Sequence, residues 1–206
     1  METWFISDTH FGHRNVLRNE PEARPFASIE QHDEEIVRRW NATVAPTDMI
    51  YHLGDVSFGV EGLGILRRLN GRKRLVMGNH DNHPLALYAE HFESVHALAS
   101  FRGQFLLSHA PLHPTELVRG KINVHGHLHS EMLTDPRYVC VSVEQTGLMP
   151  VNRDQILARA ADAADRAEAE RQARRHGRDV SRRPWRVRGA VLAPMPLCGE
   201  VIGAAP

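Results

Sequence analysis

Three histidines at alternate positions form the most distinctive local pattern in the chain, within Val124-His125-Gly126-His127-Leu128-His129. In an extended strand, side chains two residues apart share a face and lie about 6–7 Å from each other. Imidazoles at that spacing can bind one metal ion or reach two neighbouring ions. The question is which other residues complete their coordination.

Four more apolar runs end in the same way, in polar residues that are able to bind a metal. Residues 4–6 precede Asp8 and His10, residues 49–53 precede Asp55, residues 74–77 precede Asn79 and His80, and residues 105–107 precede His109. Runs of this length predict buried strands. Helical patterns over 28–40, 63–69 and 84–90 separate them, so we expect an α/β layered fold with the polar clusters at the carboxyl ends of the strands.

These clusters together supply carboxylate, imidazole and amide donors, and no thiolate. Such a set is typical of Mn²⁺, Fe, Zn²⁺ or Mg²⁺ rather than of a structural cysteine-type zinc site. Seven ligands exceed what one catalytic ion needs, whereas a bridging carboxylate gives each of two ions four protein contacts. The candidate ligands are Asp8, His10, Asp55, Asn79, His109, His127 and His129.

The ordered motifs, which span roughly residues 5–130, resemble the signature of the calcineurin-like metallophosphoesterase superfamily. The resemblance implies a four-layer αββα sandwich with a binuclear site above the strand ends. It assigns Asp8, His10, Asp55 and His129 to one ion and Asp55, Asn79, His109 and His127 to the other. It also implies that His80 faces the substrate, where it stabilises the phosphate charge or protonates the leaving oxygen.

Two positions differ from the phosphoprotein phosphatases of this superfamily. Phe58 stands where those enzymes place an aspartate that orients the catalytic histidine, and Asp81 stands where they have glutamate. Both differences favour the phosphodiesterase and nuclease branches. We therefore expect hydrolysis of small phosphodiesters, such as cyclic nucleotides, by a hydroxide that bridges two divalent ions, with Mn²⁺ preferred. A phosphomonoesterase or a nuclease on the same site, and a non-catalytic scaffold, are the alternatives.

The remaining histidines receive different roles. His13 and Arg14 follow the first motif and are candidates to contact a substrate phosphate. His52 and His125 lie inside apolar strands and are expected to be structural. Asp81 is expected to fix the geometry of a loop or of a ligand histidine.

The charge and composition of the chain indicate which classes of binding partner it favours. Residues 1–150 contain 18 Asp and Glu against 14 Lys and Arg, and this acidic, histidine-rich body suits divalent cations better than a long nucleic acid. Nucleic acid is therefore expected only as a substrate. No signal sequence or apolar span is evident, so we expect a cytoplasmic chain with no membrane partner.

We expect the chain to divide into a catalytic domain over 1–150, an Ala/Arg-rich helix over 151–176 and an irregular tail over 177–206.

Overall fold

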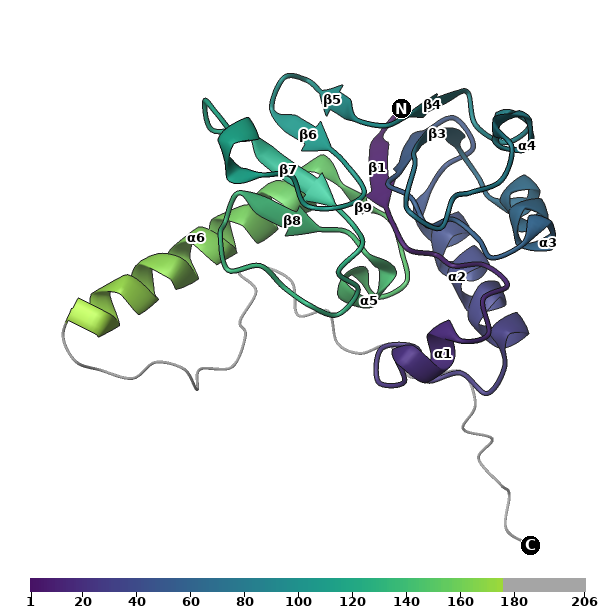
Figure 1. Ribbon diagram of the computed structural model, residues 1–206, viewed down its shortest axis with the longest axis horizontal. Helices are drawn as coiled ribbons and strands as arrows, with labels where there is room; N and C mark the ends of the chain where they lie inside the picture. Colours follow the sequence, from purple (N-terminus) through teal and green to yellow (C-terminus); the bar gives the residue numbers. More distant parts are fainter. Residues whose placement is uncertain (176–206) are drawn as a thin grey trace, which may run out of the picture.

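The computed structural model describes residues 1–175 as two β-sheets with helices around them (Figure 1). The tail predicted over 177–206 lies outside the described residues. The first sheet has the strand order β4-β3-β2-β1-β9. Its strands are β1 (Thr3–Ile6), β2 (Met49–His52), β3 (Arg72–Val76), β4 (Ser94–His96) and β9 (Val151–Asn152). Strands β1 to β4 are parallel, and β9 pairs antiparallel to β1.

The second sheet has the order β5-β6-β7-β8. Its strands are β5 (Ala99–Phe101), β6 (Phe105–Leu107), β7 (Ile122–His125) and β8 (Tyr138–Cys140). The strands β6, β7 and β8 are parallel, while β5 pairs antiparallel to β6. The predicted α/β sandwich is thus confirmed.

The predicted helices agree with the structure except near residue 64 and at residues 151–152, which pair with β1 as strand β9 instead of beginning the C-terminal helix. Helix α2 (Ile29–Thr43) begins as predicted, because the Ser28 side chain accepts a hydrogen bond from the backbone of Gln31. The single helix predicted over 63–69 is wrong: α3 (Val60–Gly64) begins earlier, and the chain then tightens into the 3₁₀ turn η1 (Ile65–Arg68). Two glycines in α3, Gly62 and Gly64, weaken a regular helix here. The other helices are α1 (Val16–Asn19), α4 (Leu85–Ala89), η2 (Pro114–Glu116), α5 (Val143–Thr146) and α6 (Arg153–Arg175).

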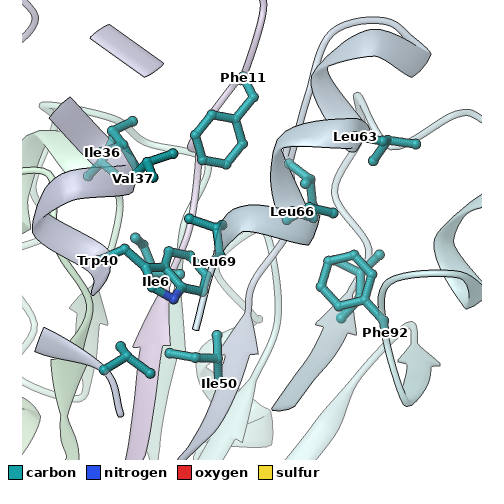
Figure 2. Close-up of a cluster of buried hydrophobic side chains, with 14 of the residues drawn as sticks. Ile6, Phe11, Ile36, Val37, Trp40, Ile50, Leu63, Leu66, Leu69 and Phe92 are labelled. Atoms are coloured by element: carbon teal, nitrogen blue, oxygen red, sulfur yellow. The ribbon is translucent and has the colours of Figure 1, made fainter. Parts of the chain in front are cut away.

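Two apolar cores hold these layers together. On the outer face of the first sheet, Trp40 of α2 and Leu66 of η1 pack toward Ile6 and Ile50 of the strands (Figure 2). The opposite face contributes Phe5 to a second core, which it shares with Leu107 and Val124 of the second sheet and with residues of α6. Burial on both faces explains the continuous apolar runs of β1 and β2.

The carboxyl ends of strands from both sheets meet at one edge of the molecule. Ser7, directly after β1, forms a parallel bridge with Ser142, which follows β8. The backbone N–H of Ser7 donates to Val141 O at 3.0 Å, so the last residues of the two sheets are hydrogen-bonded to each other. The loops that carry the predicted ligands all leave from this edge.

Helix α6 packs on the body through the start of its length and contacts β1, β8 and β9 (Figure 1). Ile156 is fully buried and Ala160 nearly so, whereas Ala161 and Ala164 are exposed. The buried apolar side chains of α6 are thus Ile156 and Ala160 in its first two turns and Ala173 near its end. Within residues 1–175, no helix combines the length and apolarity that a membrane span needs.

Replacing Ile156 with alanine removes the main apolar anchor of α6. We expect Ile156→Ala to lower the free energy of unfolding by about 2–5 kcal/mol, the usual cost of emptying a buried aliphatic site. Ala161→Ser, at an exposed position of the same helix, should change it by less than about 0.5 kcal/mol. Urea denaturation followed by circular dichroism measures both. Equal stability of the two variants would show that α6 is not anchored through Ile156.

Candidate metal centre

Five of the seven predicted ligands lie in the left-handed region of the backbone map. Their φ values are 58° for Asp8, 48° for His10, 55° for Asp55, 70° for His127 and 51° for His129. Residues other than glycine rarely adopt this conformation, which costs of the order of 1–3 kcal/mol each and is concentrated at functional sites. The left-handed turns after β1, β2 and β7 therefore cost conformational free energy, and they direct these side chains to one place.

Two glycines allow the carboxylates to approach neighbouring backbone. A Cβ atom on Gly78 would lie 2.2 Å from Asp55 Oδ1, and one on Gly126 would lie 2.4 Å from Asp8 Oδ2. Any side chain at either position would displace the carboxylate. The glycines of the Gly78-Asn79 and Gly126-His127 motifs are thus part of the centre's geometry.

The ligand atoms form two overlapping groups. In the first, Asp8, His10 and His129 each place one donor atom within 4.8 Å of the others, and in the second Asp8, Asp55 and His109 do the same. Asp8 belongs to both groups. Asp55 Oδ2, in the second group, lies 3.5 Å from His10 Nε2 of the first and 3.4 Å from His109 Nε2. The position of Asp55 beside histidines of both groups is compatible with the predicted bridging role, which stays a prediction.

Asn79 and His127 join the second group. Asn79 Oδ1 is 2.9 Å from both His109 Nε2 and His127 Nδ1, and the two ring nitrogens are 3.2 Å apart. The structure therefore brings all seven predicted ligands together, although their division between two ions stays a prediction.

One buried ligand nitrogen without a hydrogen-bond partner fits a metal ion. His10 Nε2 is buried without a hydrogen-bond partner, and burial lowers the pKa of His10 to about 2, so its imidazole is neutral as a metal ligand must be. His109 Nδ1 donates to Leu53 O at 2.8 Å, which leaves Nε2 directed at Asn79 and Asp55. A buried nitrogen lone pair with no donor is costly, and a cation satisfies it.

Electrostatics point the same way. Burial raises the pKa of Asp8, whose carboxylate has 0% exposure. Burial works against a charged His109, but the Asp55 and Asp8 carboxylates outweigh it and raise the pKa of this imidazole. The centre thus favours added positive charge, which divalent ions supply.

A buried ion pair that the sequence did not reveal positions His129. Glu144 Oε1 accepts from His129 Nδ1 at 2.6 Å and from Arg24 Nε at 2.8 Å. The hydrogen bond fixes the ring so that His129 Nε2 faces Asp8 Oδ1, 4.0 Å away. A carboxylate behind a ligand histidine sets its tautomer and raises its basicity.

Arg24 also supports the loop that carries Asp8 and His10. Its guanidinium is fully buried and donates to the backbone carbonyls of Asp8 and Thr9. It further contacts His32 Nε2 at 2.8 Å, and His32 Nδ1 in turn pairs with Asp33. The loop that carries Asp8 and His10 is therefore held by charged groups of residue 24, α2 and α5.

Asp81 joins the loops of the second and third motifs. Its Oδ2 accepts from the backbone N–H of Asp55 and of Gly78, both at 2.8 Å, and its Oδ1 accepts from Val56 N at 3.0 Å. Asp81 thus fixes loop geometry, as expected.

His80 lies at the exposed mouth of the centre. Its backbone N–H donates to Asp55 Oδ1 at 2.9 Å, and its ring centroid is 5.5 Å from that of His10. The residue is exposed to solvent.

The other two substrate-binding candidates differ in placement. His13 lies beside the centre, with its Nδ1 3.3 Å from His10 Nδ1. The Arg14 side chain is exposed and pairs with Glu30 at 3.4 Å, so no contact joins it to the ligands. Its role as a phosphate clamp stays a prediction.

The two histidines expected to be structural are buried and hydrogen-bonded. His52 Nε2 contacts Thr9 Oγ1 at 3.0 Å, and His125 Nδ1 donates to the carbonyl of Gly126 at 2.8 Å. His125 therefore supports the turn that carries His127 and His129.

Comparison with known proteins agrees with this geometry. A family model described as the calcineurin-like phosphoesterase superfamily domain matches residues 1–152. The chain belongs to this superfamily. Membership supports a metal-dependent phosphoesterase that acts on phosphoric esters and uses divalent ions.

Three relatives illustrate the similarity. The Gene 66 protein of Mycobacterium phage L5 is 33% identical over 194 residues, covering 75% of this chain and 91% of that protein. The uncharacterized protein MJ1445 of Methanocaldococcus jannaschii is 30% identical over 166 residues, covering 75% of this chain and 88% of its own. The crystal structure of AQ665 from Aquifex aeolicus, a protein of unknown function, superposes with a TM-score of 0.61 at 32% identity, covering 75% of this chain and 97% of that one.

Glu144→Gln tests the support behind His129. The substitution keeps the shape of the side chain but removes its charge, so the His129 ring loses its ionic partner and Arg24 its counter-charge. We expect Mn²⁺ affinity to fall about 10–100-fold. Equilibrium dialysis of the chelator-treated protein measures it, with the exposed Glu131→Gln as the control. Unchanged affinity in Glu144→Gln would show that this ion pair does not support metal binding.

Proposed function

We propose that the protein hydrolyses small phosphodiesters, such as cyclic nucleotides, at a centre of two divalent ions, with Mn²⁺ as the preferred metal. The observation that carries the proposal is the exposed His80 beside seven clustered candidate metal ligands, of which Asp8, His10, Asp55 and His109 are buried. Asp8, His10, Asp55 and His129 would hold one ion, and Asp55, Asn79, His109 and His127 the other. When bound, such ions neutralise phosphate charge and lower the pKa of water.

His80 supplies a proton donor for the leaving oxygen of a diester, which side chains that coordinate the metal ions cannot provide. An alkoxide is a poor leaving group, so a proton delivered to the leaving oxygen accelerates departure by about 10²–10⁴. The hydrogen bond from His80 N to Asp55 Oδ1 fixes the backbone of this residue relative to the ligand cluster. Its ring is thereby kept next to the site while remaining open to solvent and substrate.

Two observations favour small diesters over other phosphate esters. Position 58 carries phenylalanine, whose ring stacks on His13. It therefore cannot supply the carboxylate that orients the catalytic histidine in the phosphoprotein phosphatases. The excess of acidic residues over 1–150 disfavours a long, polyanionic nucleic acid. Soluble action in the cytoplasm is part of the same proposal.

His80→Ala separates proton donation from metal binding. We expect kcat on bis-p-nitrophenyl phosphate, or on a cyclic nucleotide, to fall about 10²–10⁴-fold while bound Mn²⁺ is retained. The cyclic nucleotide should show the larger loss, because its leaving oxygen is more basic than nitrophenolate. His83→Ala is the matched control, since His83 lies in the same loop but its ring faces Tyr88.

The outcome also separates the alternatives. Full activity of His80→Ala would overturn the role of His80. Faster hydrolysis of p-nitrophenyl phosphate than of its diester by the wild type would indicate a phosphomonoesterase, and preference for oligonucleotides a nuclease. Neither metal binding nor hydrolysis would indicate a scaffold.

A further inference from the structure

Phe58 is a large apolar residue that is exposed to solvent next to the candidate metal centre. It is 58% exposed, although its backbone is well fixed: Phe58 N donates to Phe11 O at 2.8 Å. A Cβ atom on Gly12 would lie 3.2 Å from Phe58 O, so the two ligand loops are in close contact here. The ring is therefore presented by a rigid turn.

The ring of Phe58 continues a line of rings that leads out of the centre. His129 stacks on His10 with centroids 5.2 Å apart, His10 is 5.2 Å from His13, and His13 stacks on Phe58 at 4.5 Å with an interplanar angle of 13°. His80 lies beside this line, 5.5 Å from His10 and 6.4 Å from His13. Phe58 is thus two ring contacts beyond a predicted metal ligand.

His13 covers one side of the Phe58 ring, while more than half of the side chain is accessible. A planar aromatic partner gains the most from such a ring, because it can stack and remove apolar surface from water. Stacking on an aromatic side chain is the common, sequence-tolerant way in which proteins bind nucleobases. The centroid distances of 5.2 Å from His10 to His13 and 4.5 Å from His13 to Phe58 leave room for the sugar that joins a base to its phosphate.

We propose that Phe58, supported by His13, is the stacking surface for the nucleobase of a nucleotide whose phosphate occupies the metal centre. The inference rests on the proposed function and narrows its substrate class to diesters that carry a base. A docked protein is disfavoured, because a specific interface buries about 800 Å² on each partner. Phe58 and Val60 are the exposed large apolar side chains of this turn, and two such residues supply far less area.

Binding of a nucleotide and of a sugar phosphate without a base tests the proposal without requiring turnover. The probes are adenosine monophosphate and ribose phosphate, which share a phosphate and a sugar but differ in the base. Isothermal titration calorimetry in Mn²⁺ would measure both with wild type, Phe58→Ala, Phe58→Trp and the control Val60→Ala. Val60 is 54% exposed, on the same turn.

We expect wild type to bind adenosine monophosphate about tenfold or more tightly than ribose phosphate, and Phe58→Ala to lose that preference. Phe58→Trp and Val60→Ala should keep it. The same affinity of wild type for both probes, or a preference that survives in Phe58→Ala, would overturn the proposal. A shift from oligomer to monomer in Phe58→Ala, measured by light scattering, would overturn it in favour of an interface between copies of the chain.

The two proposals fail separately. Hydrolysis of cyclic nucleotides without a base preference in binding would refute the stacking surface alone. A base preference that depends on Phe58, without any diester hydrolysis, would refute the proposed function and leave the nucleobase site standing.

Discussion

Two buried carboxylates placed among imidazoles impose the constraint on which the rest of the structure depends. Asp8 and Asp55 are almost completely buried. Oxygens of Asp8 lie near ring nitrogens of His10 and His129, and oxygens of Asp8 and Asp55 lie near His109. Burying such charges together is unfavourable unless positive charge balances them. The raised pKa of His109 is a consequence of this imbalance, and the buried His10 Nε2 has no hydrogen-bond partner. Divalent cations resolve both.

Buried hydrogen bonds and ion pairs hold the loops that carry these ligands in place. The left-handed turns at five ligands carry a conformational cost, and the buried network of Arg24 and Glu144 offsets part of it by bonding to the Asp8–Thr9 backbone and to His129. Asp81 performs the same task for the turns at Asp55 and Gly78. His80 and Phe58 are exposed beside this network, and His13 is partly exposed.

The sequence predicted what depends on local pattern and missed what depends on distant contacts. Strands β1, β2, β3, β6 and β7 are apolar runs that end in a polar motif, so the strands and the polar side chains gathered after them could be inferred. Strands β4 and β5 have three residues each and are only partly buried, which leaves no clear period. Arg24 and Glu144 lie 120 residues apart and belong to no motif, so only the folded chain reveals their pairing. The stacking of Phe58 on His13 was hidden for the same reason.

Anomalous diffraction at the manganese edge, from crystals grown with Mn²⁺, tests the central claim most directly. The account predicts two peaks per chain, about 3.5–4 Å apart. One should contact Asp8, His10 and His129, the other Asn79, His109 and His127, and Asp55 should contact both. A single peak, or two peaks that do not share Asp55, would contradict the account.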